Sequence, residues 1–368
     1  MTLREFIKYW LPYGIENKLR HQRDKRQGLL PLDGYLEYID SGQSTEFSDV
    51  PYKYRSIITV HGYGYSGSGA VIDLLREFSN VRTLAGNEPQ FNKLKVEEDL
   101  SEIDFPQVAG GLFDLEHYIN SRNIFLNDAV MNRFVRMISH SDIYYRFPET
   151  RPAVFKFMHH LINFTLPHLK EKYYNGPQSE LTVKGSDIYT LKHLSLKEYR
   201  NICRLFIREL FNSIPPIEGK DTLVLDGFLC DLEYDNKRYQ EFVPGIKTIV
   251  VYRDPRDIYA FAIDKKIEWI PLDADTFIEW IKLSTERFDI HSSDFLVIRF
   301  EDLVMQYQHT RDTLIGYLGL EPGMQCKNKM YFDPAISAKN IGIWKNSRVN
   351  KGDFDKIHNN LPELCYDK

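Results

Sequence analysis

The most informative segment of this chain is Ser56-Ile57-Ile58-Thr59-Val60-His61-Gly62-Tyr63-Gly64-Tyr65-Ser66-Gly67-Ser68-Gly69-Ala70-Val71-Ile72-Asp73-Leu74-Leu75. Its first residues are rich in β-branched side chains, which is typical of a strand. Apolar side chains then recur with the i, i+3, i+4, i+7 spacing of an amphipathic helix, at Val71, Leu74, Leu75 and Phe78. The segment therefore predicts a strand, a loop of small residues and a helix.

The loop between this strand and this helix has the composition of an anion-binding site. Glycines let the backbone approach a ligand closely, and the first N–H groups of a helix have no partner within the helix. These donors and the helix dipole favour a phosphate at the start of the helix. We therefore expect the loop to bind a phosphorylated ligand through Gly64, Tyr65, Ser66, Gly67, Ser68, Gly69 and Ala70.

The loop differs from the Walker A motif, Gly-x-x-x-x-Gly-Lys-Ser/Thr. Gly62 and Gly67 have the spacing of that motif, but Ser68 stands where the lysine would reach the terminal phosphates. A nucleotide kinase or nucleotide-binding switch stays open as an alternative, because an apolar strand ending in Asp226 is typical of a Walker B magnesium ligand.

A second segment points to the same kind of ligand: Lys247-Thr248-Ile249-Val250-Val251-Tyr252-Arg253-Asp254-Pro255-Arg256-Asp257-Ile258-Tyr259. It reads as a buried strand followed by a helix, since Pro255 and the acidic residues beside it suit a first helical turn. Arg253 would then lie at the carboxyl end of a strand, where open α/β sheets bind their ligands. Its guanidinium group suits bidentate binding of a phosphate.

Together the two segments resemble the sulfotransferases that use 3′-phosphoadenosine 5′-phosphosulfate (PAPS). In that family a loop after the first strand holds the 5′-phosphosulfate, and a strand ending in Arg-Asp/Asn-Pro-Arg/Lys-Asp holds the 3′-phosphate. Residues 295–303 and 317–320 are similar to later segments of the family, and residues 342–346 to one that packs on the cofactor. The resemblance covers about residues 55–348. It implies that PAPS, or its product adenosine 3′,5′-bisphosphate, is bound without a metal, with contacts from Arg253, Arg256, Trp344 and Lys345.

Two positions differ from the pattern of that family. Tyr65 stands where the family has Lys or Arg before the Ser-Gly of the loop, and Phe261 stands where it has a serine. The cation that neutralises the leaving group must therefore come from elsewhere in the chain. The candidates are Arg256, Lys339, Lys345 and Arg348.

Sulfuryl transfer to an alcohol requires a general base, for which the sequence offers two candidates. Glu88 follows the predicted second strand, at 81–85, and is similar in position to the glutamate base of glycan- and protein-modifying sulfotransferases. His159 ends a run, 153–158, that we interpret as a strand, and a histidine base suits neutral pH. Lys156 in this run is a further candidate for the missing cation.

The order of predicted elements favours an α/β fold. Helices alternate with strands predicted at 56–60, 81–85, 153–158, 222–226, 247–252 and 295–300. This alternation predicts a three-layer sandwich with a central parallel sheet, similar to P-loop proteins and to the sulfotransferase fold. We expect one sulfotransferase domain over 51–368, in which helical insertions at about 110–150 and 168–215 form a lid or acceptor pocket.

Composition is that of a cytoplasmic enzyme. The chain has 368 residues, 43% of them hydrophobic, and a net charge of −5, which argues against bulk nucleic-acid binding. Its four cysteines lack metal-type spacing, and neither a signal peptide nor a membrane-spanning run is visible. The basic extension 1–50 carries seven basic and three acidic residues through Leu30, so peripheral contact with an anionic membrane stays open beside docking on the chain's own domain.

The sequence leaves the acceptor open. The 23 Phe and 23 Tyr residues suit a pocket for a sterol-like alcohol, and equally platforms for the rings of a saccharide. A non-catalytic protein that binds PAPS with the same fold is a further alternative, with Tyr65 and Phe261 as signs of lost activity. The oligomeric state is not indicated by the sequence.

Overall fold

The structure of the chain is a computed structural model that describes residues 35, 38–84, 112, 115–117, 119, 148–166, 188–228, 240–267, 269–286 and 295–367. The chain forms two compact units. The sheet unit comprises Val50–Gly110 and Pro215–Lys368, and the helix-pair unit comprises Met1–Asp49 and Gly111–Ile214. The glycine loop and Arg253 both belong to the sheet unit.

Five parallel strands form the centre of the sheet unit, in the order β2-β5-β1-β6-β7. The strands are β1 (Ser56–Gly62), β2 (Val81–Leu84), β5 (Thr222–Asp226), β6 (Lys247–Tyr252) and β7 (Leu296–Arg299). All five coincide with strands predicted from the sequence. Because the strands are parallel, their carboxyl ends meet at one edge of the sheet, so the glycine loop after β1 lies beside Arg253 after β6.

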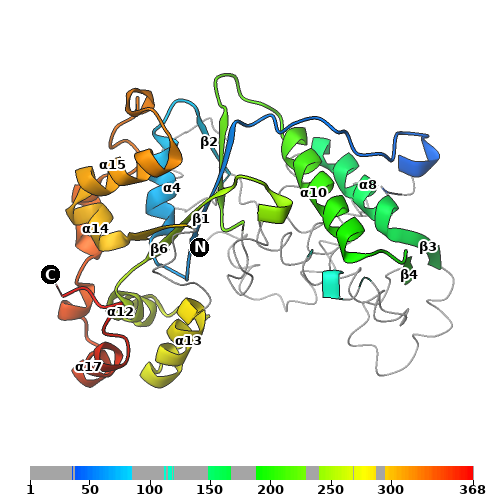
Figure 1. The fold of residues 1–368 in the computed structure, drawn as a ribbon. Coiled ribbons are helices and arrows are strands. Elements are labelled where there is room, and N and C mark those ends of the chain that lie inside the picture. The colour runs from blue at the N-terminus through cyan, green and yellow to red at the C-terminus, as the bar shows by residue number, and fades with distance from the viewer. Residues whose placement is uncertain are drawn as a thin grey trace, which may run out of the picture. The chain divides into compact units, whose positions relative to one another are not determined.

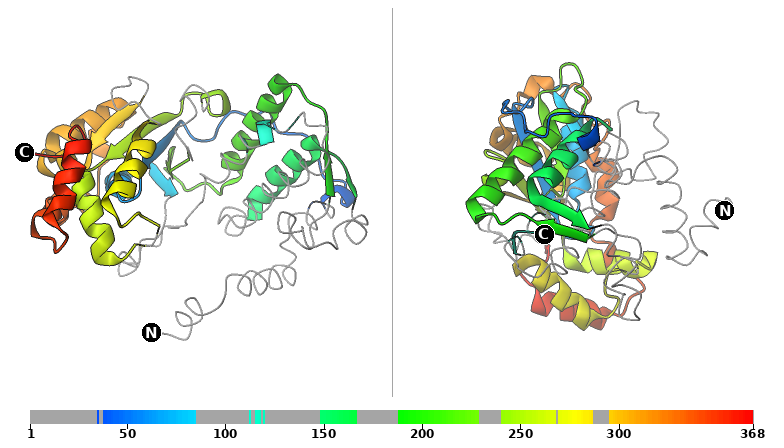
Figure 2. Two further views of the ribbon diagram at one scale, coloured as in Figure 1. Left: turned by 90° about the horizontal axis from the view of Figure 1, so that it is seen from below. Right: turned by 90° about the vertical axis from the view of Figure 1, so that its right-hand side faces the viewer.

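Helices cover both faces of this sheet (Figures 1 and 2). One face packs on α4 (Ser68–Arg76), α14 (Phe300–Met305) and α15 (Tyr307–Leu318), and the other on α12 (Pro255–Lys265), α13 (Ala274–Glu286) and α17 (Lys351–Asn360). Alternation along β6 explains the two cores, since Ile249 and Val251 join the α4 side and Val250 the α12 side. The predicted α/β sandwich with a central parallel sheet is confirmed.

Short helices connect the last elements of the sheet unit. They are η4 (Pro322–Met324), α16 (Pro334–Ser337), η5 (Ala338–Asn340) and η6 (Ile343–Asn346). Two of them, η5 and η6, lead the chain past the end of β6, where the Asn340 carbonyl oxygen accepts a hydrogen bond from Arg253.

The helix-pair unit contains η2 (Pro148–Thr150), α8 (Arg151–Leu161), α10 (Leu196–Ser213) and an antiparallel pair of strands, β3 (Ile162–Leu166) and β4 (Ile188–Leu191). A capping box formed by Ser195 and Glu198 starts α10. The two helices pack through stacked rings of Phe157 and Phe206, whose centroids lie 4.5 Å apart.

The strand predicted at 153–158 is wrong, because these residues lie inside α8. Ala153, Phe157 and Leu161 are fully buried at i, i+4 and i+8, which is the spacing of a helix. Pro152 in the first turn also favours a helix, since its missing N–H has no partner to lose there. A short apolar run in a buried helix shows no alternation with polar residues, so it reads like a buried strand.

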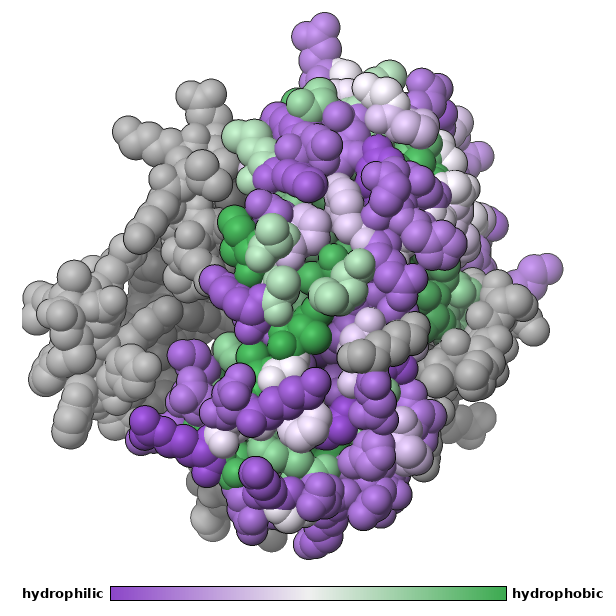
Figure 3. All heavy atoms as spheres, turned by 90° about the vertical axis from the view of Figure 1, so that its left-hand side faces the viewer, coloured by the Kyte–Doolittle hydropathy of each residue, from purple (hydrophilic) through white to green (hydrophobic). Residues whose placement is uncertain are grey.

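In the described part of the chain, no helix combines the length and the apolar sequence needed to cross a bilayer. The face drawn in Figure 3 carries mostly hydrophilic residues, with a smaller group of hydrophobic ones near its middle.

Candidate functional site

The turn between β1 and α4 is a tight loop in which two glycines are required. A Cβ atom at Gly62 would lie 1.9 Å from Ser66 Oγ and 2.7 Å from the carbonyl oxygen of Val251 on the neighbouring strand. Gly67 has a φ of +97°, and a Cβ there would lie 2.5 Å from the ring of Phe300. Any larger residue at either position would displace the backbone of the loop, so the glycines fix its path.

The first turn of α4 lacks any anionic partner of its own. No side chain caps this helix, and its first turn contains no acidic residue. By contrast, Asp254 caps α12 and Asn350 caps α17 through side-chain oxygens. The uncapped end of α4 therefore keeps its N–H groups and its positive dipole end for an external anion. Ser66 is fully buried beside it, and within the described ranges Ser66 Oγ has no hydrogen-bond partner.

Arg253 provides a buried positive charge next to this loop. Only 7% of the residue is exposed, and its Nη1 donates to the carbonyl oxygen of Tyr65 at 3.4 Å. Its Nη2 donates to the carbonyl oxygen of Asn340 at 2.5 Å, and its Nε has no hydrogen-bond partner in the described part of the chain. Among the described residues no carboxylate forms an ion pair with this guanidinium. The guanidinium also lies over the ring of Phe300, 5.2 Å from its centroid. A buried cation whose described partners are carbonyl groups and a ring still lacks the anion that would compensate its desolvation.

The pKa of Arg253 reflects both its burial and the negative charges near it. Burial lowers it from its ordinary value, and the negative charges of Asp257, Glu301 and Asp254 oppose that shift. An arginine in a protein nevertheless stays protonated. The site therefore carries a permanent positive charge that a bound anion would stabilise.

Tyr63 links the glycine loop to the turn that carries Arg253 through hydrogen bonds. Its hydroxyl donates to the carbonyl oxygen of Arg253 at 2.8 Å and accepts from the Arg253 N–H at 3.2 Å. Burial raises the pKa of Tyr63 far above its usual value, so the phenol stays neutral and can donate. With the Tyr65 contact, three hydrogen bonds join the two segments, although 188 to 190 residues separate them along the chain.

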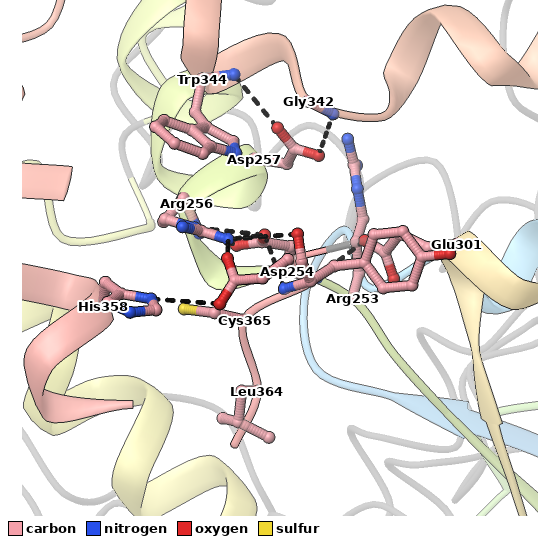
Figure 4. Close-up of polar contacts among 12 residues, drawn as sticks. Arg253, Asp254, Arg256, Asp257, Glu301, Gly342, Trp344, His358, Leu364 and Cys365 are labelled. Carbon is pink, nitrogen blue, oxygen red and sulfur yellow. Dashed lines mark hydrogen bonds and ion pairs between the residues drawn. The ribbon is translucent and has the colours of Figure 1, made fainter. Parts of the chain in front are cut away.

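Arg256 is occupied by acidic side chains of the protein. Its guanidinium group donates to both carboxylate oxygens of Asp254, forms an ion pair with Asp367 at 2.8 Å, and stacks over the ring of Trp344 at 4.3 Å (Figure 4). Asp254 also accepts from the backbone N–H of Tyr366. In this structure Arg256 therefore attaches the C-terminal segment to the start of α12.

Asp257 holds the segment that contains Trp344. Its carboxylate accepts from the backbone N–H of Gly342 at 2.8 Å and from that of Trp344 at 3.1 Å (Figure 4). Burial raises the pKa of Asp257, and these two hydrogen bonds oppose the shift. This contact brings Trp344 to the first turn of α12, while Lys345 beside it is exposed.

Glu301 lies beneath the Arg253 turn and is fully buried. One carboxyl oxygen accepts from the backbone N–H of Asp254 at 2.9 Å, and the other, Oε2, has no partner. Burial raises the pKa of Glu301 to about 7. The carboxyl group thus supports the turn from the first turn of α14, which follows β7, and its charge is expected to change near neutral pH.

The residues predicted to bind the cofactor all lie in the sheet unit. The loop residues 64–70 follow β1, Arg253 and Arg256 follow β6, and Trp344 and Lys345 lie in η6. Direct contacts join the loop to Arg253 and Arg256 to Trp344.

The structure describes one of the two candidate bases, His159, and not the other, Glu88. Glu88 lies outside the described residues, so its predicted role stays a prediction. His159 is near the C-terminal end of α8 in the helix-pair unit, where its carbonyl oxygen accepts from Lys192. Burial lowers the pKa of His159, which favours its neutral form. Lys156, also in α8, forms an ion pair with Glu209 at 2.5 Å, so its charge is compensated within the unit.

Sequence reasoning missed three residues that shape the site: Tyr63, Asp257 and Glu301. Glu301 had a usable signal, because it follows a predicted strand closely, as Asp254 does. The role of Tyr63 depends on a contact with a residue 190 positions away, which no local pattern indicates.

A hollow of about 420 Å³ lies at the opposite edge of the sheet, lined by residues that include Arg55, Asn80 and Asp221. Arg55 forms an ion pair with Asp221 at 3.0 Å, and the Asn80 amide donates to the same carboxylate. The charges of Arg55 and Asp221 are thus matched to each other, unlike that of Arg253.

Comparison with known proteins gave structural similarity alone. No family model and no curated protein matches the chain. The sulfotransferase domain of the Synechococcus PCC 7002 olefin synthase is 9% identical, with a TM-score of 0.36 over 86% of this chain and 98% of that one. Sulfotransferase STF9 from Mycobacterium avium is 12% identical, with a TM-score of 0.38 over 94% and 85%. Sulfotransferase STF1 from Mycobacterium tuberculosis H37Rv is also 12% identical, with a TM-score of 0.36 over 85% and 81%. Because these TM-scores are below 0.5, the function proposed below depends on contacts within this chain.

Proposed function

We propose that this protein is a sulfotransferase that takes a sulfuryl group from PAPS and transfers it to a hydroxyl group of an acceptor. The observation that carries the proposal is the buried Arg253 guanidinium beside the glycine loop. Its Nη1 lies 3.4 Å from the Tyr65 carbonyl oxygen, and its Nε has no hydrogen-bond partner among the described residues. A ligand with two phosphate groups can place one at the uncapped end of α4 and the other at Arg253.

The residues present suit the phosphate groups of such a ligand. In this proposal the first turn of α4 and Ser66 bind the 5′ end of the nucleotide, and Arg253 binds its 3′-phosphate. Trp344 packs on the cofactor, as the family resemblance implies. When bound, PAPS supplies an activated sulfuryl group, and adenosine 3′,5′-bisphosphate leaves. Fixed N–H donors at the start of α4 stabilise the charge of the departing 5′-phosphate without reorganising.

Arg253 differs from the other candidate cations in its contacts. Tyr65 contributes no positive charge, and Arg256 is already balanced by Asp254 and Asp367. Lys339, Lys345 and Arg348 are exposed. Of these side chains Arg253 is the one that contacts the loop, through the Tyr65 carbonyl oxygen, and in this proposal its ligand is the 3′-phosphate.

The acceptor must lose a proton as its oxygen bonds to sulfur and the bond from sulfur to the phosphate oxygen breaks. We propose Glu88 as the general base, with His159 as the second candidate. Glu88→Gln should lower kcat about 10²- to 10⁴-fold, because a positioned general base contributes this much. The dissociation constant for adenosine 3′,5′-bisphosphate should stay unchanged. Full activity of this variant would move the role to His159.

The activity itself is tested by incubating the protein with PAPS and a panel of sterol-like alcohols and saccharides, and measuring adenosine 3′,5′-bisphosphate by chromatography. Release that depends on an acceptor supports the proposal and identifies the acceptor class. Tight binding of adenosine 3′,5′-bisphosphate without turnover on any acceptor would favour a non-catalytic binding protein.

A nucleotide kinase is the second candidate, because one observation favours it. Asp226 ends β5 and lies in register with Val60 on β1, just before the glycine loop, as a Walker B aspartate would. Ser68 in place of the Walker A lysine weighs against this function. Hydrolysis of ATP, measured beside PAPS turnover under the same conditions, distinguishes the two enzymes.

A further inference from the structure

Three aromatic side chains form a cluster on the glycine loop, which we call the aromatic platform: Tyr65, Phe261 and Trp269. The ring of Tyr65 lies 4.9 Å from that of Phe261 and 5.6 Å from that of Trp269, and it is nearly parallel to Trp269, with an interplanar angle of 16°. Trp269 is 60% exposed and Tyr65 is 37% exposed. Among the large hydrophobic residues that are exposed in the described part of the chain, these two are the aromatic ones.

The loop is shaped to accept Trp269. A Cβ atom at Gly64 would lie 2.1 Å from the Trp269 ring, so the indole packs directly on the backbone of the loop. Trp280 contacts the other end of this arrangement, with its ring 6.3 Å from that of Trp269 in an edge-on orientation. Trp269 is thus held in place by the loop, by Tyr65 and by Trp280, although most of its own surface faces solvent.

Tyr65 connects the aromatic platform to the Arg253 guanidinium group. The Tyr65 side chain belongs to the platform, while the Tyr65 carbonyl oxygen accepts from Arg253 Nη1. Tyr65 adopts a φ of +61°, a conformation that non-glycine residues rarely take. This backbone conformation costs free energy. In this structure it accompanies a residue whose ring packs in the platform and whose carbonyl group binds Arg253.

The two positions that differ from the sulfotransferase pattern are therefore in direct contact. Tyr65 and Phe261 replace a cation and a serine, and their rings pack against each other. Both positions therefore present aromatic surface. An aromatic surface binds the face of a planar ring. Stacking of a nucleic-acid base on an aromatic side chain is strong and depends little on which base it is.

We propose that Tyr65, Phe261 and Trp269 form a stacking site for a planar ring of a ligand held in the Arg253 site. The inference rests on the proposed function for the anionic part of the ligand and adds the ring beside it. Two ligands of that function offer such a ring: the base of the nucleotide and the ring of a flat aromatic alcohol as acceptor.

The test compares the wild-type protein with Trp269→Leu and Trp269→Phe. Trp269 is largely exposed, so Leu should leave folding intact, which circular dichroism checks, and Phe restores an aromatic face. Binding is measured by calorimetry with adenosine 3′,5′-bisphosphate, with inorganic pyrophosphate, which has no ring, and with 2-naphthol in the presence of the bisphosphate. Trp269→Leu should weaken binding of the ring-bearing ligand about 5- to 100-fold, leave pyrophosphate unchanged, and be rescued by Phe.

Loss for the bisphosphate identifies the nucleotide base as the stacked ring, and loss for 2-naphthol alone identifies the acceptor. Equal affinities of the wild-type protein and Trp269→Leu for all three probes, with clear binding to the wild type, would overturn the aromatic platform and leave the proposed function standing. If neither the bisphosphate nor pyrophosphate binds the wild-type protein, the anion site is refuted, and the proposed function falls together with this inference.

Discussion

Replacing Glu301 by Gln should change how the stability of the protein depends on pH. Glu301 is fully buried beneath the Arg253 turn, and its pKa is about 7 in the folded chain, against 4.5 for an ordinary glutamate. Because the folded state holds this proton more tightly than the unfolded state, the wild-type protein loses stability as pH rises from about 4.5 to above 7. The loss for this difference in pKa is about 3 kcal/mol once the carboxyl group is ionised in both states.

Glutamine keeps the oxygen that accepts from the Asp254 N–H, but it cannot ionise. The free energy of unfolding of Glu301→Gln, relative to that of the wild type, should therefore increase by about 3 kcal/mol between pH 4.5 and pH 8. Urea unfolding followed by tryptophan fluorescence at pH 4.5, 6, 7 and 8 measures this difference. Glu279→Gln removes a carboxylate from an exposed position on α13 and controls for net charge. A difference between wild type and Glu301→Gln that stays constant with pH would refute the buried, titrating carboxyl group.

The remaining predictions concern the path of the loop and the support of the Arg253 turn. Gly62→Ala should lower the stability by about 1–3 kcal/mol, because its Cβ would collide with Ser66 Oγ and the Val251 carbonyl oxygen. A Cβ atom at Gly69 in α4 would meet nothing within 4 Å, so Gly69→Ala should be neutral or stabilising by up to about 1 kcal/mol. Thermal unfolding of Gly62→Ala and Gly69→Ala tests this difference. Equal melting temperatures of the two variants would contradict the loop geometry. An anion bound at Arg253 should disfavour the ionised form of Glu301, because the two negative charges repel each other. The affinity for pyrophosphate, measured by calorimetry, should therefore fall more steeply above pH 7 in the wild type than in Glu301→Gln. The same dependence of affinity on pH in both proteins would contradict this coupling.

The sequence predicted the sheet well because its strands are short, buried and rich in β-branched residues. Residues 56–60, 222–226 and 247–252 each carry such a run and are strands in the structure. The same signal failed at 153–158, where a buried helix also presents consecutive apolar residues. Helix and strand could be told apart there only by Pro152 and by the spacing of Ala153 and Phe157.

The site was predictable in its parts, and its connections were not. The glycine loop and Arg253 each carry a local pattern, and parallel strands bring both to one edge of the sheet. Whether a given cation is free depends on partners far away in sequence. Arg256 forms an ion pair with Asp367, 111 positions later, whereas the hydrogen bonds of Arg253 to described residues go to carbonyl groups. Such pairings follow from tertiary packing, which a pattern of neighbouring residues does not record.

The central claim is that Arg253 and the glycine loop together bind a doubly phosphorylated nucleoside. The most direct test is calorimetric titration of wild type, Arg253→Gln and Arg311→Gln with adenosine 3′,5′-bisphosphate at one fixed salt concentration. Arg311 contacts Gln325 and Asp312, so its replacement controls for the loss of one charge. The wild type and Arg311→Gln should bind alike, and a folded Arg253→Gln should bind about 10- to 100-fold more weakly, since a lost charge-assisted hydrogen bond costs about 1.5–3 kcal/mol. Equal binding by Arg253→Gln, or no binding by the wild type, would contradict the claim.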